Sequence, residues 1–422
     1  MRGCVLLLLV LTFAAHADGV SLTIGQAEAA LEGPWRFQPG DNPRWATPEF
    51  DDSEWATLDL RPAPGAHDAD VGLSNYVRGW WAQGFAGHAG YAWYRLRVHI
   101  DAPPDTRLAL LAPAYVEDAY QVFWNGDLIG SAGDFSGATP SARSTKPRMF
   151  ELPRTTGAGA DAVIAIRVWM QPGSDREADA GGIHIAPRIG EWKAVHDHYR
   201  LQWLETFRGY VVDVVEPFVF VLLAGFSWLS RRRQASVTFA FWLGTALLLT
   251  ALLRVNQAVY FWFDVESQNT FAVVKSVLLE PLGLAAWILA WLHWFRLARS
   301  RFLPWLLSGA IVMTMIVVLA DTAPWLRTLL RVVAAVSLIT IAIVGCREPR
   351  PDRWLAVTCL ILVSIGQFAE ELWAIGVPGI WFPFSTGVSR TQFAYAALIV
   401  SLSALTFRSV LRADSQDASS GQ

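Results

Sequence analysis

The chain has 422 residues, of which 53% are hydrophobic and 17% charged, and its formal net charge is −3 at pH 7. This apolar content excludes an intrinsically disordered chain. The arginines gather in short loops beside long apolar stretches, so they are explained by membrane topology and do not indicate nucleic-acid binding.

Residues 1–17 have the features of a secretory signal peptide. Arg2 supplies the positive start, residues 5–13 are apolar, and Ala15-His16-Ala17 is a small-x-small cleavage site. The apolar run is too short to cross a bilayer, which takes about 20 residues. We therefore expect residues 18–190 to form an exported, periplasmic domain, long enough to bury a core of its own without a disulfide.

Residues 18–190 show the periodicity of β-structure. Tyr94, Leu96, Val98 and Ile100 alternate with polar or aromatic neighbours, as in a strand with one buried face. Asn125-Gly126 is a strong turn dipeptide, and glycine and proline recur about every ten residues. The pattern predicts an all-β sandwich or jelly roll. From residue 191 to 208 the apolar spacing becomes helical, which predicts a stalk helix leading into the first membrane span.

The second half predicts an all-α bundle of seven transmembrane helices. Arginines follow the first, third, fifth and seventh spans, which predicts that these loops are cytoplasmic and that residues 18–190 lie outside the inner membrane of a bacterium. Residues 411–422 are expected to form a disordered cytoplasmic tail. The predicted spans are 209–229, 236–256, 270–292, 302–320, 328–346, 354–373 and 391–410.

Several ionisable residues interrupt these apolar stretches. A charge at the centre of a bilayer costs at least about 2.5–3.5 kcal/mol, so such residues should face the interior of the bundle and pair. Arg254 and Glu371, at the ends of their spans, should pair in the same way, and the alternative for them is to reach the interface. Pro217 and Pro281 can bend their helices. The predicted intramembrane cluster comprises Asp213, Glu216, Lys275, Glu280, Arg331 and Glu370.

Aromatic residues of the exported domain divide into two groups. Trp35, Phe37, Trp55 and Tyr94 are expected in the core. Others are candidates for stacking on a sugar ring, because a flat aromatic face covers its apolar side. For Trp80 and Trp81 the alternatives are a lid packed on the domain or contact with the membrane surface. The candidate ligand-binding residues are Trp45, Tyr76, Trp80 and Trp81.

Five short motifs stand out in residues 18–190. They are Pro34-Trp35-Arg36-Phe37-x-x-Gly40-Asp41, Phe50-Asp51-Asp52-Ser53-x-Trp55, Gly90-Tyr91-x-Trp93-Tyr94-Arg95, Trp124-Asn125-Gly126-x-x-Ile129-Gly130 and Gly181-Gly182-Ile183. These motifs resemble the galactose-binding-like jelly roll at the front of family 2 glycoside hydrolases, a non-catalytic domain. Joined to seven membrane helices, that domain resembles bacterial seven-transmembrane receptors with diverse intracellular signalling modules.

The resemblance implies a sensory receptor for a small-molecule or carbohydrate ligand. Relatives continue into a cyclase, kinase or phosphatase domain, whereas this sequence stops. We therefore expect a separate cytoplasmic partner, such as a diguanylate cyclase, kinase or phosphatase, which would bind Arg231, Arg232 and Arg233. Two other functions stay open. One is a transporter or channel with a proton or cation site in the acidic cluster, and the other is an envelope scaffold that binds glycans without signalling.

The sequence does not favour an enzyme. It has no Gly-x-Ser-x-Gly elbow and no His-Glu-x-x-His motif. His196 and His198 lie two apart in a predicted helix and so point to different faces, which disfavours a metal pair. We expect no catalytic residue, no metal and no cofactor.

Overall fold

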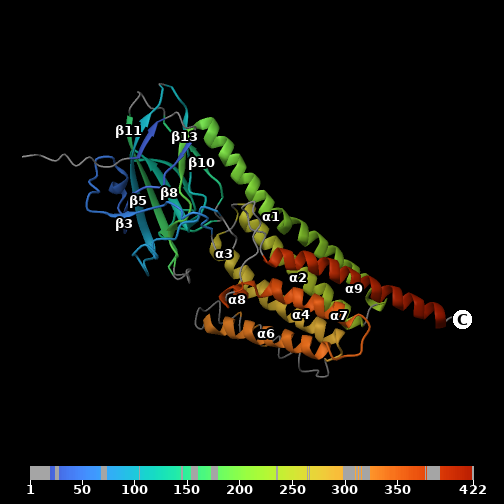
Figure 1. Cartoon of the computed structure of the whole chain (residues 1–422). Coiled ribbons are helices and arrows are strands. Elements are labelled where there is room, and N and C mark those ends of the chain that lie inside the picture. The colour runs from blue at the N-terminus through green and yellow to red at the C-terminus, as the bar shows by residue number, and fades with distance from the viewer. Residues whose placement is uncertain are drawn as a thin grey trace, which may run out of the picture.

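The computed structural model describes residues 20–420 apart from 24–27, 68–73, 104, 144–145, 154–159, 173–178, 234–235, 264, 266, 298–308, 310–311, 313–314, 316–323, 376 and 378–389. The described chain has two parts (Figure 1): sheets over residues 20–191, here the β domain, and helices over residues 192–420, here the helical domain. The expected leader and most of the predicted span 302–320 lie outside the described residues.

The larger sheet of the β domain is built around two long strands, β5 (Gly90–Asp101) and β11 (Ala160–Met170). These strands are antiparallel over 11 residue pairs, in which Leu96 lies opposite Ile164. All its pairs are antiparallel except that of β1 (Val20–Thr23) with β5. The remaining order is β4 (Ala56–Leu58), β3 (Trp35–Pro39), β5 (Gly90–Asp101), β11 (Ala160–Met170), β8 (Ala119–Trp124) and β9 (Asp127–Ala132).

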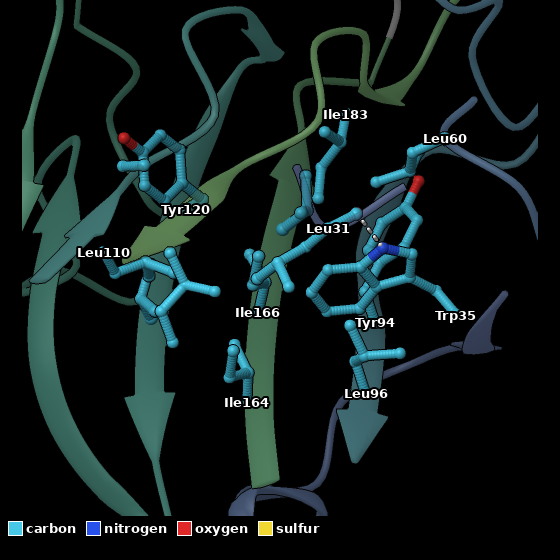
Figure 2. Close-up of a cluster of buried hydrophobic side chains, with 14 of the residues drawn as sticks. Leu31, Trp35, Leu60, Tyr94, Leu96, Leu110, Tyr120, Ile164, Ile166 and Ile183 are labelled. Carbon is cyan, nitrogen blue, oxygen red and sulfur yellow. Dashed lines mark hydrogen bonds between the residues drawn. The ribbon is translucent and has the colours of Figure 1, made fainter. Parts of the chain in front are cut away.

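A second sheet covers one face of the first. Tyr94, Leu96, Ile164 and Ile166 point from the larger sheet toward Leu110 of the second, and all five are buried (Figure 2). Full burial of one such aliphatic side chain contributes about 1.5–3 kcal/mol. The all-β prediction is confirmed. The second sheet has the order β10 (Met149–Glu151), β6 (Leu108–Leu111), β13 (Arg188–Glu191), β2 (Glu28–Ala30), and β12 (Gly182–Ile183) pairs with β7 (Val116–Glu117).

The helical domain contains four segments long and apolar enough to cross a membrane: Val237–Tyr260, Thr270–Trp294, Trp325–Gly345 and Arg390–Arg412. Val214–Leu229 and Arg353–Gln367 are shorter apolar segments. The described residues therefore show four of the seven predicted spans at full length. The helices are α1 (Trp192–Leu229), η2 (Arg231–Arg233), α2 (Val237–Trp262), α3 (Gln268–Val273), the π-helix η3 (Val274–Leu279), α4 (Glu280–Trp294), α6 (Pro324–Gly345), α7 (Arg353–Gln367), α8 (Ala369–Ala374) and α9 (Arg390–Ser420).

Two predicted boundaries differ from the structure. The predicted span 354–373 is broken after Gln367, where Phe368 leaves the helical conformation between α7 and α8. The predicted disordered tail is also wrong for residues 411–420, which continue α9. Polar composition suggested disorder there, but alanine, arginine and glutamine are good helix formers that extend an existing helix.

The predicted stalk and the predicted first span form one helix. α1 begins at Trp192, directly after β13, and runs without interruption for 38 residues, which is about 57 Å at 1.5 Å per residue. Figure 1 shows it leaving the β domain beside β13 and running along the helical domain. The end of a strand in the β domain is thus covalently and helically continuous with the bundle.

The first turns of α1 are packed on the β domain. Val195 is fully buried against Ala109 and Leu111, whose strand is covered by the core on its other face. Glu28 accepts hydrogen bonds from both Arg188 and His198, at 2.9 Å each. These contacts fix the beginning of the helix to the second sheet.

A second contact joins the two domains. The Gln268 amide at the start of α3 donates a hydrogen bond to the Ala142 carbonyl in the β domain, at 3.1 Å. The β domain is therefore attached to the helical domain at α1 and again at α3.

Candidate functional site

The four aromatic residues that were predicted to be buried in the β domain are buried. Trp35 and Phe37 are fully buried, Tyr94 is 1% exposed and Trp55 is 8% exposed. The Trp35 indole donates a hydrogen bond to the Leu31 carbonyl at 2.8 Å. These aromatics stabilise the sandwich and are not available to a ligand.

The structure does not bring the four candidate ligand-binding residues together. Along β5 successive side chains alternate between faces, so that Trp93 and Tyr94 point in opposite directions. Trp45 packs with Trp93 and Trp55 on the outer face of the larger sheet. Trp80, by contrast, belongs to the core on the inner face.

Trp80 is a correction to the predicted binding site. Its side chain is fully buried, and its indole donates a hydrogen bond to the His88 carbonyl at 3.1 Å. A Cβ on Gly181 would lie 2.4 Å from the Trp80 Nε1, so the chain passes directly over the ring. The prediction failed because a segment without strand periodicity can still contribute a large core side chain.

Trp81 is half-buried and packs against the same core. Its indole also donates to the His88 carbonyl, at 2.8 Å. These contacts match the alternative prediction that Trp81 belongs to a lid packed on the domain.

Tyr76 lies in a small cluster of polar and aromatic side chains, here the Tyr76 cluster: Tyr76, Tyr115, Glu117 and His184. The Tyr76 ring stacks on the fully buried His184 ring with centroids 4.9 Å apart and planes at 9°. The Tyr115 ring lies 5.1 Å from His184, and Glu117 Oε2 lies 3.6 Å from His184 Nε2. Both tyrosines are half-buried, and the Glu117 side chain is 27% exposed.

Glu117 is held as a carboxylate. Burial alone would raise its pKa, but the nearby His184 ring, 3.6 Å away, and the hydrogen bond from the Gly181 amide outweigh burial and lower the pKa. The Gly181 N–H donates to Glu117 Oε2 at 2.6 Å. The cluster thus presents two tyrosines and a fixed acceptor on a partly open edge of the sandwich. Sequence reasoning found only Tyr76, because the other members come from two distant segments.

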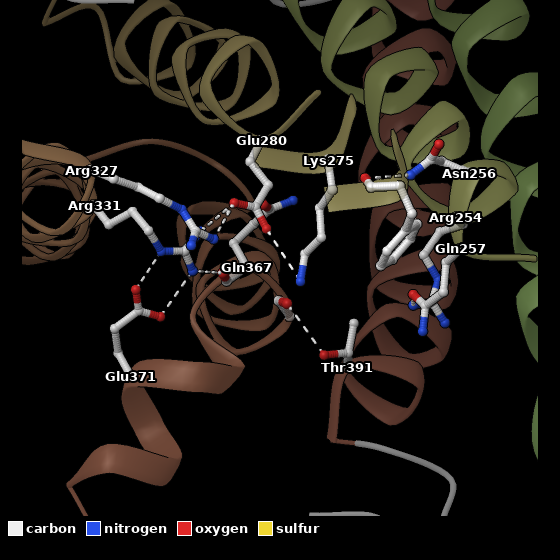
Figure 3. A network of polar contacts seen from close by, with 12 residues as sticks. Arg254, Asn256, Gln257, Lys275, Glu280, Arg327, Arg331, Gln367, Glu371 and Thr391 are labelled. Carbon is white, nitrogen blue, oxygen red and sulfur yellow. Dashed lines mark hydrogen bonds and ion pairs between the residues drawn. The ribbon is translucent and has the colours of Figure 1, made fainter. Parts of the chain in front are cut away.

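The helical domain contains a network of buried and partly buried charges, centred on Glu280 at the start of α4 (Figure 3). Glu280 Oε2 lies 3.1 Å from Arg327 Nη2 and 3.2 Å from Arg331 Nη1, and its Oε1 lies 3.7 Å from Lys275 Nζ. Arg331 also donates to Glu371 Oε2 at 2.9 Å and to the Gln367 carbonyl at 2.7 Å. One carboxylate is therefore shared by three basic groups.

The same network reaches α1 and α2. Glu216 on α1 pairs with Arg254 on α2 at 3.1 Å, and each side chain is 3% exposed. The Arg254 guanidinium lies 5.8 Å from the centroid of the Tyr395 ring on α9. Gln367 donates to the Tyr395 hydroxyl at 2.9 Å, which joins this pair to the Arg331 side of the network.

A π-helical turn places two members of the network. Lys275 is the second residue of η3 and Glu280 directly follows η3, and the Glu280 amide donates to the Lys275 carbonyl. The wider turn puts residues five apart on one side, which brings their side chains together. Pro281, which lacks an N–H, follows at once and is the sequence feature that disrupts regular α-helical bonding there.

Glu216, Lys275, Glu280 and Arg331 form ion pairs within the helical domain. Arg254 and Glu371 also form ion pairs, with Glu216 and Arg331, so simple exposure at an interface does not describe their contacts. The side chains of Asp213 and Glu370 lie outside the described residues.

The predicted partner-binding arginines form η2, directly after α1. Arg231 and Arg232 are exposed, and the Arg233 side chain is not among the described ones. Elsewhere, the described residues contain no group of three or more His, Cys, Asp or Glu side chains arranged to hold a metal ion. The His198 ring pairs with Glu28.

No protein-family model and no curated protein sequence matches the chain. Solved structures similar to it include a β-glucuronidase from Bacteroides uniformis (18% identity, 38% of this chain, 17% of that chain, TM-score 0.26). A second is a glycosyl hydrolase family 2 member from Bacteroides cellulosilyticus DSM 14838 (18% identity, 39% of this chain, 20% of that chain, TM-score 0.28). A third is a family 2 β-galacturonidase from Eisenbergiella tayi (16% identity, 39% of this chain, 24% of that chain, TM-score 0.25). The chain spans about a fifth of their length. Similarity at this level does not identify an activity or a ligand.

Proposed function

We propose that the chain is a membrane sensory receptor, whose β domain binds a ligand and whose helices carry the signal across the membrane. The observation that supports this most is the unbroken α1 helix. It begins where β13 ends, is packed on the second sheet through Val195, and continues to Leu229 in the bundle. A rearrangement of the β domain that tilts or shifts the start of this helix is transmitted along its length.

The Tyr76 cluster is the proposed ligand site. Its tyrosines offer ring faces and hydroxyls, and Glu117 offers an ionised acceptor, which is the combination that recognises a polyhydroxylated ligand such as a carbohydrate. The His184 Nδ1–H donates a hydrogen bond to the Val77 carbonyl at 2.9 Å and so ties the site to the segment before Trp80. Binding at this edge would move β7, β12 and the loops that flank these two strands.

The charge network is the proposed switching element. Glu280 forms ion pairs with three basic side chains, and Arg331 forms ion pairs with both Glu280 and Glu371. Such shared partners allow two packings of α6 and α8 that differ in which pair is kept, and a signal can bias one over the other. Arg254 and Glu216 would pass movement of α1 into the same network.

In the proposed orientation the β domain is periplasmic and the arginine-rich loops are cytoplasmic. Arg231 and Arg232, exposed just after α1, would contact a signalling partner such as a diguanylate cyclase, kinase or phosphatase. A transporter with a cation site at Glu280 is not favoured, because the cation would have to displace Lys275, Arg327 and Arg331.

The ligand site is tested on the full-length chain in nanodiscs with a glycan and small-molecule thermal-shift screen. A ligand that raises the melting temperature should lose its effect in Tyr76→Ala. Trp45→Ala is the matched control, since it removes a half-buried aromatic from the opposite face. Loss of binding in the control but not in Tyr76→Ala would place the site elsewhere.

The partner surface is tested by co-purification. Replacing Arg231, Arg232 and Arg233 with glutamine should release the cytoplasmic partner while ligand binding persists. A reporter fusion at the C-terminus must show that topology is unchanged, because these arginines also orient the chain. Full retention of the partner with unchanged topology would rule out this surface.

A further inference from the structure

An open pocket of about 600 Å³ lies at the start of α7, against α9. Its walls include Arg350 from the turn before α7, Arg353 at the first position of α7, and Arg408 from α9. Trp354, also in the wall, belongs to the first turn of α7 and is 61% exposed. Arginines from a turn and from two helices thus line one cavity.

Asp352 holds the arginines of α9 at this pocket. The residue precedes α7 in the left-handed conformation (φ 59°), and its side chain does not cap the helix. Instead its carboxylate pairs with Arg408 at 3.3 Å and with Arg412, and its side chain is only 5% exposed. The one acidic side chain of the wall is therefore used to position two arginines from another helix.

The pocket retains an excess of positive charge. Arg350 lies over the Trp294 ring at 5.5 Å and Arg353 over the Trp354 ring at 5.3 Å. Among the described residues no carboxylate forms an ion pair with either guanidinium. Arg350, Arg353 and Arg408 line the pocket and Arg412 lies beside Asp352, and these four arginines outweigh Asp352 and the nearby Glu348. The N-terminal end of the α7 dipole adds to the positive potential.

The apolar surroundings indicate the kind of anion. α7 is an apolar helix from Arg353 to Gln367, so the pocket lies where that helix would enter a bilayer. Exposed tryptophan at a helix end is typical of the membrane–water interface. Basic pockets at the ends of membrane helices match the charge of lipid phosphates.

We propose that this pocket binds the phosphate headgroup of an anionic membrane lipid. Arg353 and Arg408 contact the phosphate oxygens, and Trp354 lies beside the glycerol and acyl region. Asp352 acts as a positioning residue that keeps Arg408 and Arg412 turned toward the headgroup. The proposal requires α7 to be membrane-embedded, and it is independent of any ligand in the β domain.

The test is native mass spectrometry of the full-length chain released from detergent with phosphatidylglycerol, with phosphatidylcholine, or with inorganic phosphate. Wild type should retain phosphatidylglycerol and not phosphatidylcholine. Arg353→Gln with Arg408→Gln should weaken that binding at least about tenfold, because two charge-assisted contacts are lost. Arg232→Gln with Arg347→Gln is the control, since both are exposed arginines outside the pocket wall.

An equal loss of phosphatidylglycerol binding in the control pair would show that the lipid is held by general surface charge, and it would overturn the proposal. So would unchanged phosphatidylglycerol binding in Arg353→Gln with Arg408→Gln, or inorganic phosphate displacing the lipid at equal concentration, which would make the site one for a free anion. If the glutamine pair fails to fold, Arg353→Lys with Arg408→Lys keeps the charge and should bind more weakly than wild type. Undiminished binding by the lysine pair would refute a role for paired guanidinium contacts.

Discussion

Glu216→Gln tests whether α1 is energetically locked into the bundle. Glu216 and Arg254 are 3.1 Å apart, and each side chain is only 3% exposed, so water cannot replace a lost partner. Removing one member of such a buried pair costs about 3–5 kcal/mol, because the remaining charge stays buried. The folding equilibrium should fall about 100-fold or more, since each 1.4 kcal/mol is a factor of ten.

The assay is equilibrium unfolding in mixed micelles, followed by tryptophan fluorescence. Glu151→Gln is the control: its pair with Arg107 joins side chains that are 54% and 52% exposed, and exposed pairs contribute about 0–1 kcal/mol. The exchange Glu216→Arg with Arg254→Glu should recover part of the loss. Recovery stays incomplete because the contact of Arg254 with the Tyr395 ring is gone.

If Glu216→Gln destabilises the chain no more than Glu151→Gln does, the pair does not lock α1, and the proposed route from β domain to bundle loses its energetic basis. A full cost that the exchange leaves unrelieved would point to a packing defect unrelated to charge.

Two further predictions concern the β domain. Gly182→Ala should lower its thermal unfolding midpoint far more than Gly87→Ala: both glycines have positive φ, but only at Gly182 would the new Cβ meet an atom, Tyr94 Oη at 2.3 Å. Equal midpoints would show that the loop yields freely. Glu117 has a pKa lowered below its ordinary 4.5 in the folded chain, so its stabilising contribution is present above that pH and lost as pH falls through the lowered value. The stability difference between wild type and Glu117→Gln, measured by urea unfolding, should shrink on acidification. A difference that is constant from pH 7 to strongly acidic conditions would show that His184 does not set this titration.

Much of the β domain could be predicted because its signals are local. Alternation along β5 and the turn at Asn125-Gly126 depend on neighbouring residues, and β5 and the β8–β9 hairpin form as they predict. The same locality explains the error at Trp80. Its burial is decided by Gly181 and Gly182, about 100 residues away, which no periodicity can reveal.

In the helical domain the sequence identified charged residues but not all their partners. Glu216 and Glu280 stood out because charge inside an apolar stretch is costly. Arg327, a partner of Glu280, is near the start of a helix, where an isolated sequence suggests solvent. Only the packing of α1 against α2 and of α4 against α6 brings the two glutamates into contact with their arginine partners. The π-helix η3, which aligns Lys275 with Glu280, likewise depends on the chain around Pro281.

The proposed signalling route requires α1 to carry movement from the β domain to the far end of the helical domain. The direct measurement is the distance between spin labels at Ser230, just after α1, and Leu411, an exposed position on α9, by double electron–electron resonance. The chain has its cysteines replaced by alanine and is studied with and without a ligand that requires Tyr76. We expect the ligand to change the distance between the two labels. This change should disappear when two glycines are inserted after Arg200, although the ligand still binds. An unchanged distance at saturating ligand, or a shift that survives the insertion, would contradict the proposed signalling route.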